Sequence, residues 1–484
     1  MKKTILFALA LALLGGAAYA NFGALDTVPA ATLLVPYIIV DADANGVPDP
    51  AGYTTLTVVT NVSSTKQLIH VTVYNAASEG VVDFDEVLTG YDVWSINWRD
   101  LVTGDFENFD TGKVASGFWT GTIGKVGSPF GPSTNVPGEP AIGLNDPQDS
   151  DYPAPSSTGC GFPWGNLTGY ASIIVGKLQS PLFGYPTQDT DCGTGGMART
   201  MASPAFLANL GVSPLFFYAT IDSVKACNGL FPDQAPAYWD TPVADYTGYT
   251  YNGYNTRNNV LTGYDFYLNF TANYSESLPT VNIEAAATWP YPADAGFYTV
   301  KRAESGAVTT TDDREPLPTA WAFNYFNTNG ITTEVSVWKS VNELDQVDAV
   351  IYGCQPYIYY AWDEDEKSKS RTTTTCPSGL CFGNPEPNLF PFETQKVAVN
   401  ATNFSGLMSG NGWLMLIFDP SFNFFPNDDV QDVVESYVFA KYNYGAYSTS
   451  VQATSMGNYW ILTQLPEAVL PNLNTYDGNT VIFE

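Results

Sequence analysis

The chain has 484 residues and a formal net charge of −30, from 19 Lys and Arg against 49 Asp and Glu. So acidic a surface repels nucleic acid and anionic membranes, and the sequence holds no basic stripe that could follow phosphates. Because 45% of the residues are hydrophobic and only 14% are charged, the composition excludes a disordered acidic tail and predicts a folded globular protein.

Residues 1–20 have the pattern of a bacterial secretory signal peptide. Its parts are two initial lysines, the apolar run 5–14 and the small-x-small cleavage site Ala18-Tyr19-Ala20. The apolar run is too short to span a bilayer. We therefore expect a mature chain that begins at Asn21, is secreted to the periplasm, cell surface or exterior, and has no transmembrane segment.

Short runs that alternate apolar and polar residues follow, separated by turn residues. A first group is expected as strands at 55–61, 68–74, 90–97, 170–175 and 215–221. A second group follows in the same order at 319–327, 333–338, 393–400, 412–418 and 435–442. The repeated order indicates a duplication. It predicts an all-β fold of two immunoglobulin-like antiparallel β-sandwich units with long loop insertions.

The expected division of the chain follows from these groups. It is a signal peptide at 1–20, a first sandwich at 21–290, a link at 291–315 and a second sandwich at 316–484. The first sandwich is expected to carry Gly-, Pro- and Cys-rich insertions. A helix is expected at 203–210, where Ser203 can cap a first turn that contains Pro204.

Six cysteines in an exported chain favour disulfides over a zinc site, because the single histidine lies far from the close-set pair Cys376 and Cys381. Six cysteines allow 15 connectivities, so the pairing stays open. The six are Cys160, Cys192, Cys227, Cys354, Cys376 and Cys381.

One loop has the spacing of a calcium site. Oxygen-bearing residues alternate along it, and Gly46 permits a sharp bend. The loop resembles the non-helical calcium loops of integrin-type and thrombospondin-type domains. The alternative is an Asx-rich turn that needs no ion. The candidate Ca²⁺ ligands are Asp41, Asp43, Asn45, the carbonyl of Val47, and Asp49.

His70 is the only histidine, so any Ser-His or Cys-His catalysis would have to be built on it. It alternates with Ile69, Val71 and Val73, and we expect a half-exposed strand histidine that faces solvent or a neighbouring sheet. Asp83 and Asp85 are likewise expected on the solvated face of a sheet.

The best binding candidate is a stretch of aromatic residues among Asn, Asp and Gly. Exposed aromatic rings beside amides suit sugar rings or another protein's surface, although well-packed tyrosines over a sandwich edge would give the same pattern. The candidates are Tyr238, Trp239, Tyr246, Tyr249, Tyr251 and Tyr254.

Several short blocks resemble a group of exported bacterial β-rich proteins of unknown function. The blocks are 29–37, 88–100, 281–285, 316–319 and 389–395. The resemblance implies export and the fold, and it supplies no activity or site.

We expect a non-enzymatic structural or adhesive protein at the cell surface or outside the cell, which binds glycans or assembles with itself through aromatic loops. One variant is strand donation by the apolar segment 31–40. The alternative is a carbohydrate-active hydrolase that uses a pair of carboxylates.

Overall fold

The computed structural model describes about half of the chain. The described residues are 28–42, 47–76, 80–103, 174–179, 215–224, 231–232, 238, 243–245, 248–250, 255–285, 296–298, 314–340, 357–364, 368–373, 389–390, 393–404, 407, 410–418, 434–445 and 447–457. The expected signal peptide, the expected helix at 203–210 and all six cysteines lie outside these ranges. The part that is described contains no helix long and apolar enough to cross a membrane.

The fold is all-β, as predicted, and its four main sheets are antiparallel. Sheet I has the order β10-β9-β2-β5 and sheet II the order β11-β1-β6-β3-β4. Sheet III has the order β16-β13-β18-β19 and sheet IV the order β15-β14-β17-β12-β20, while β7 and β8 form a separate ribbon.

The bounds of the elements in the first half are β1 (Thr32–Val40), β2 (Tyr53–Asn61), β3 (Gln67–Asn75), β4 (Gly80–Leu88), β5 (Val93–Asn97), α2 (Trp98–Thr103), β6 (Leu215–Val224), β7 (Val243–Asp245), β8 (Gly248–Thr250), β9 (Leu261–Asn269), β10 (Tyr274–Pro279) and β11 (Val281–Ile283). Those in the second half are β12 (Ala320–Phe326), β13 (Ile331–Lys339), β14 (Tyr357–Asp363), β15 (Ser368–Thr373), β16 (Thr394–Ala398), β17 (Asn411–Ile417), β18 (Ser436–Tyr444), β19 (Tyr447–Gln452) and β20 (Thr454–Gly457).

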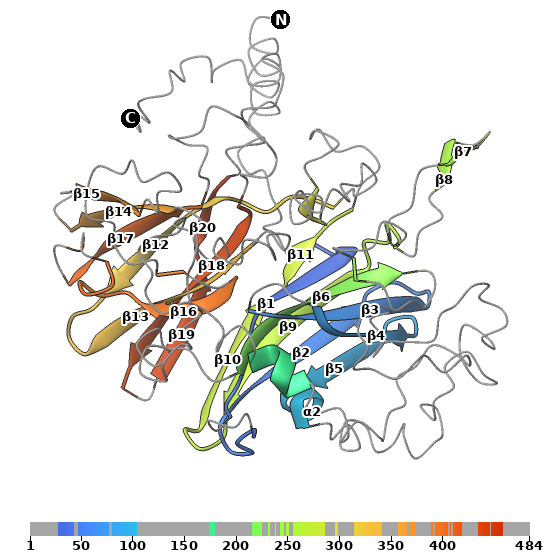
Figure 1. The fold of residues 1–484 in the computed structure, drawn as a ribbon, viewed down its shortest axis with the longest axis horizontal. Coiled ribbons are helices and arrows are strands. Elements are labelled where there is room, and N and C mark those ends of the chain that lie inside the picture. Colours follow the sequence, from blue (N-terminus) through green and yellow to red (C-terminus); the bar gives the residue numbers. More distant parts are fainter. Residues whose placement is uncertain are drawn as a thin grey trace, which may run out of the picture.

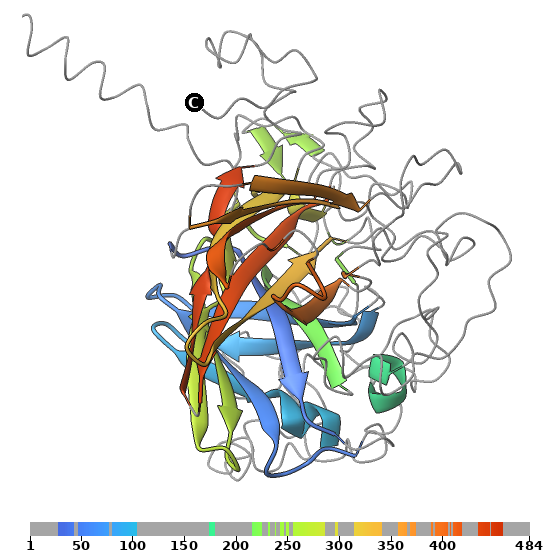
Figure 2. The ribbon, with the colours of Figure 1, turned by 90° about the vertical axis from the view of Figure 1, so that its left-hand side faces the viewer.

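The four sheets pack as two face-to-face pairs. Sheet I contacts sheet II through β1, β2 and β9, and sheet IV contacts sheet III through β12, β13 and β18. The two pairs then meet where β1 and β6 of sheet II contact β13 and β16 of sheet III, and where β10 of sheet I contacts β19 of sheet III. Figures 1 and 2 show sheets III and IV, in orange to red, gathered on one side of sheets I and II. Sheet II therefore has a neighbouring sheet on each face.

Strand β1 shows the consequence of this double cover. All nine of its residues are buried, because a strand with both faces covered has no solvated side to give an alternating pattern. Pro36 lies within it, and the pairing with β6 shifts register between Val35 and Ile38, so the missing N–H of Pro36 falls at an irregularity of the ladder. The strand pairs with β6 along most of its length and with β11 over Thr32–Leu34, so this part of segment 31–40 has a neighbouring strand of its own chain on each side.

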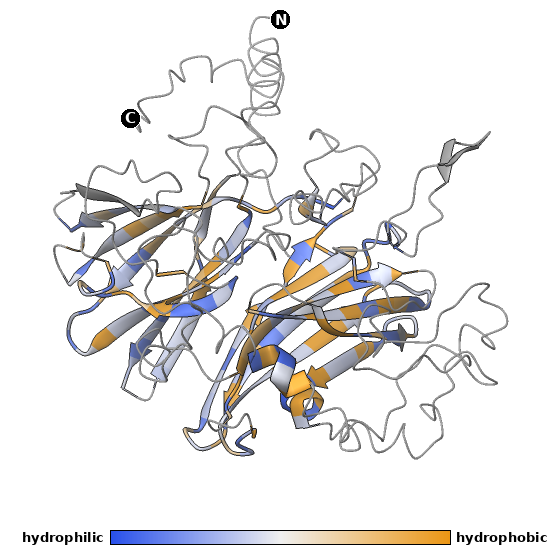
Figure 3. Cartoon of the chain, viewed as in Figure 1, coloured by the Kyte–Doolittle hydropathy of each residue, from blue (hydrophilic) through white to orange (hydrophobic). Residues whose placement is uncertain are grey.

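The apolar core is continuous between the two pairs. One cluster of buried residues lies inside the first pair, between sheets I and II. A second cluster extends from Tyr218 of sheet II to Trp338 of sheet III, whose ring centroids are 5.8 Å apart. Figure 3 shows hydrophobic residues spread along the strands of the first pair, in keeping with sheets that are buried on their facing sides. Apolar side chains therefore make up part of the interface that joins the two pairs.

The predicted strands are largely present, but one of them is helical where it is described. Residues 174–179 are helical, so the expected strand at 170–175 is wrong at its described end. The expected duplication makes β5 equivalent to β16, but the two strands occupy different positions in their sheets. Strand β5 pairs with β2 in sheet I, whereas β16 pairs with β13 in sheet III. The equivalence of β3 and β6 with β13 and β18 holds as two antiparallel pairs.

Candidate functional site

A buried polar row crosses four strands of sheet II on the face turned toward sheet III. Its register places Asp85 of β4 opposite His70 of β3, and His70 opposite Asp222 of β6. Asp222 in turn lies opposite Thr32 of β1. Because directly opposed residues of a sheet point to the same side, the four side chains meet in one line. All four are fully buried.

Asp222 is the centre of this row. Its Oδ1 accepts a hydrogen bond from the Thr32 hydroxyl, and its Oδ2 accepts from the hydroxyls of Tyr238 at 2.9 Å and Tyr298 at 2.8 Å. Arg314 donates through Nε to Thr32 Oγ1 at 2.6 Å and places Nη2 3.9 Å from Asp222 Oδ1. The row therefore ties segments from distant parts of the chain to sheet II.

His70 is enclosed by carboxylates. Its Nδ1 lies 2.9 Å from Asp85 Oδ1 and its Nε2 lies 3.6 Å from Asp83 Oδ2. Burial by itself lowers the pKa of His70, but the carboxylates of Asp85, Asp83 and Asp222 outweigh it and raise that pKa to about 8. The charged imidazolium is thus favoured at neutral pH.

These positions correct two predictions. His70 was expected to be half exposed, and Asp83 and Asp85 on a solvated face, yet all three side chains are fully buried. The physical reason is that the polar face of sheet II is covered. Sheet III and the segments that carry Tyr238 and Tyr298 lie over it. A closed His–Asp cluster among hydrogen-bonded hydroxyls has the geometry of a structural anchor.

The aromatic loop candidates do not form an exposed face at the position that is described. Tyr238 is fully buried and its hydroxyl is held by Asp222, so this ring is not available to a surface ligand. Tyr249 lies in β8, whose side chains are not described. Trp239, Tyr246, Tyr251 and Tyr254 lie outside the described residues.

The calcium loop is described only at its two ends. Asp41 and Asp49 are brought together by a backbone hydrogen bond from Asp49 N to Asp41 O at 2.8 Å. The carboxylates already serve the loop, because Asp41 Oδ2 accepts from Tyr53 N and Asp49 Oδ1 accepts from Ala51 N. Asp43 and Asn45 lie outside the described residues, so the calcium site stays a prediction.

A group of aromatic residues lies on the outer face of sheet IV, away from sheet III. We call it the aromatic face, and it comprises Tyr360 and Trp362 of β14, Trp413 of β17, and the exposed Asn324 of β12. Trp362 and Trp413 are opposed in register and stacked, with ring centroids 3.6 Å apart and planes inclined by 4°. Tyr360 lies 5.7 Å from Trp362, and Asn324 is opposite Trp413.

Gly412 explains how the two indoles come together. A Cβ at this position would lie 1.9 Å from the carbonyl oxygen of Trp362, so only glycine permits β17 to approach β14 this closely. The sequence pattern predicts strand 412–418 but does not indicate the aromatic face. The available signal was the alternation of Tyr360 with Trp362 in an aromatic strand.

The three aromatic side chains are only half buried, whereas Met415 and Ile417, which follow Trp413 on the same face of β17, are buried. Since each stacked indole covers one face of its partner, each keeps one ring face that its partner does not cover. Such rings, beside an exposed amide, can bind the apolar side of a ligand and orient its polar groups.

Comparisons with protein-family models, with curated protein sequences and with solved structures find no match to this chain.

Proposed function

We propose that this is an exported, non-enzymatic protein of the cell surface or exterior that binds neutral glycans through the aromatic face of sheet IV. The observation that carries the proposal is the stacked pair Trp362 and Trp413, half buried beside the exposed Asn324 on an outer sheet face.

The chemistry of the aromatic face favours a sugar. An indole offers a large, rigid apolar surface that matches the C–H side of a pyranose ring, and the Asn324 amide can both donate to and accept from hydroxyls. Cleavage of the signal peptide would take the net charge from −30 to −30 − 2 = −32 by removing two lysines. This charge repels acidic polysaccharides, so the proposed ligand is neutral.

Each pair of sheets is also proposed to be an immunoglobulin-like sandwich unit that arose by duplication. In support, β2 and β12 each lead into a strand of the facing sheet, and β3 with β6 matches β13 with β18 as a central antiparallel pair. Two sandwich units packed against each other would suit a structural or adhesive role, because a ligand bound to one unit is then linked to the other.

The test is a pull-down of the mature protein with insoluble cellulose, starch and mannan, beside the acidic polysaccharides alginate and pectate. We expect retention by at least one neutral polymer and by neither acidic one. Trp413→Ala should weaken that retention by about 10-fold or more, which corresponds to about 1.4 kcal/mol.

Two further variants keep the result interpretable. Asn324→Ala leaves the stacked indoles intact and should also weaken retention. Tyr447→Ala removes an aromatic ring that is 79% exposed elsewhere and should have no effect. Retention of the Trp413→Ala protein at wild-type strength, with an unchanged melting curve, would contradict the proposal, as would a failure of every neutral polymer to retain the wild type.

Export has its own test. N-terminal sequencing of the protein recovered outside the cytoplasm should begin at Asn21. A protein that remains in the cytoplasm with Met1 or Lys2 at its terminus would remove the export part of the proposal.

A further inference from the structure

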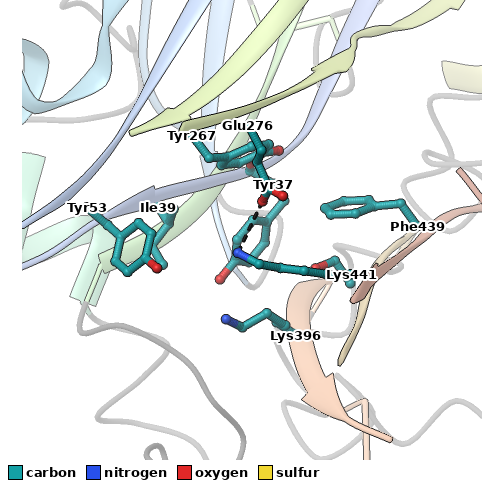
Figure 4. A pocket seen from close by; sticks show the side chains of 9 residues that line it. Tyr37, Ile39, Tyr53, Tyr267, Glu276, Lys396, Phe439 and Lys441 are labelled. Carbon is teal, nitrogen blue, oxygen red and sulfur yellow. Dashed lines mark hydrogen bonds and ion pairs between the residues drawn. The ribbon is translucent and has the colours of Figure 1, made fainter. Parts of the chain in front are cut away.

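A small cavity lies at the interface between the two pairs of sheets. Its volume is about 30 Å³, which is enough room for about two water molecules. Tyr37 of β1 and Glu276 of β10 line it from the first pair, and Ser336, Lys396 and Lys441 line it from sheet III. Figure 4 shows the two lysines reaching from the second pair toward Tyr37.

Some hydrogen-bond donors around this cavity are not used by contacts between the described residues. The Tyr37 hydroxyl is buried and has no hydrogen-bond partner among the described residues. Lys441 Nζ donates to Tyr274 Oη at 2.7 Å and pairs with Glu276 Oε1 at 3.1 Å, which leaves one of its three N–H groups. Lys396 Nζ pairs with Glu334 Oε2 at 3.4 Å and retains two.

The nearby carboxylates are already engaged. Glu276 Oε2 accepts from the Ser450 hydroxyl at 2.8 Å, in addition to the pairing of its Oε1 with Lys441. Glu334 Oε2 accepts from Asn443 Nδ2 at 3.1 Å as well as pairing with Lys396. After these contacts, the cavity lining still offers the Tyr37 O–H and lysine N–H groups as donors.

The two ammonium groups also repel each other. Burial lowers the pKa of Lys441 and the Lys396 ammonium lowers it further, while the carboxylates of Glu276 and Glu334 oppose these effects only in part. A negative charge between the two nitrogens would relieve that repulsion, whereas a water molecule would not, because it carries no charge and accepts only two hydrogen bonds.

We propose that this cavity binds a single small anion of the size of chloride, held by the Tyr37 hydroxyl and the Lys396 and Lys441 ammonium groups. The space excludes sugars and phosphate by size. Because its ligands come from both pairs of sheets, the anion fastens sheets I and II to sheet III. About a fifth of the Lys396 side chain is exposed, so the anion can exchange with solvent.

The experiment measures the melting temperature of the mature protein at one ionic strength in sodium chloride and in sodium gluconate, whose anion is too large for the cavity. We expect chloride to raise the melting temperature by about 1–3 °C, since a ligand that binds only the folded state stabilises it. Tyr37→Phe and Lys396→Gln should each abolish this increment.

Matched controls remove the same groups elsewhere. Tyr447→Phe and Lys66→Gln change a hydroxyl and a charge at exposed positions and should keep the increment. Equal melting temperatures in the two salts for the wild type would overturn the proposal, and so would a full increment in both cavity variants.

A second experiment uses only the wild type, so it does not depend on whether the variants fold. It measures anomalous diffraction from crystals grown in sodium bromide. An anomalous bromide peak within hydrogen-bond distance of the Tyr37 hydroxyl would support the site. Density for water alone at that position would overturn it.

Discussion

Replacement of His70 by Gln is expected to remove a pH dependence from the stability of this protein. Gln retains an N–H group that can donate to Asp85, which lies 2.9 Å from His70 Nδ1, but it cannot carry a proton. The variant therefore removes the titration while it keeps much of the shape and hydrogen bonding of a fully buried site.

The magnitude follows from the pKa of His70 in the folded protein. That pKa is raised from 6.5 to about 8, because the neighbouring carboxylates outweigh the opposing effect of burial. The difference corresponds to stabilisation on the order of 2 kcal/mol. Since the folded-state pKa lies above the unfolded one, this stabilisation is fully present below about pH 6.5 and is lost as the pH rises through 8.

Lys339 gives the stability the opposite pH dependence. The test therefore compares the wild type with the His70→Gln variant at each pH. Burial lowers the pKa of Lys339 from 10.5 to about 7, with Glu393 opposing, so this group alone makes the fold more stable as the pH rises above 7. Its effect is common to both proteins and cancels in the difference between wild type and His70→Gln.

The assay is urea unfolding of both proteins between pH 6 and pH 9, followed by tryptophan fluorescence. The advantage of the wild type over His70→Gln should shrink by about 2 kcal/mol across this range. A difference that stays constant with pH would refute the assignment of a protonated histidine to the buried row, whatever the size of that difference.

Three other outcomes are expected, two from the structure and one from the calcium prediction. Gly412→Ala should destabilise the fold by about 1–3 kcal/mol in urea, because the added Cβ meets the Trp362 carbonyl; unchanged stability would show that β14 and β17 are not so close. Tyr298→Phe should cost about 1.5–3 kcal/mol by removing a hydrogen bond to the charged Asp222, and a neutral effect would contradict that contact. EDTA should lower the melting temperature of the wild type and not of Asp43→Ala, and an identical wild-type curve with and without chelator would remove the calcium hypothesis.

Much of the local structure follows from the residue pattern. The alternation in 55–61 and in 333–338 predicts β2 and β13, which the structure contains at Tyr53–Asn61 and Ile331–Lys339. This success has a simple cause, since a strand with one covered face must place apolar residues at every second position. The helical segment 174–179 was missed because a short apolar run gives the same signal for a strand and a buried helix.

The candidate sites depended on contacts that no local pattern contains. Alternation correctly predicted that His70 lies on the opposite face of its strand from Val71 and Val73. It carries no information on the cover of that polar face by sheet III and by the segments hydrogen-bonded to Asp222. Trp362 and Trp413 lie far apart in the sequence, and only the pairing of β14 with β17 stacks them.

The amino-acid pattern alone decides that this chain forms short antiparallel strands, because side-chain alternation and turn residues act over a few neighbouring positions. The stacking of four sheets decides which polar residues are buried, which aromatic rings meet, and where lysines gather beside a cavity. These outcomes arise from packing between segments that are distant in sequence, and packing of that kind leaves no periodic signal in either segment.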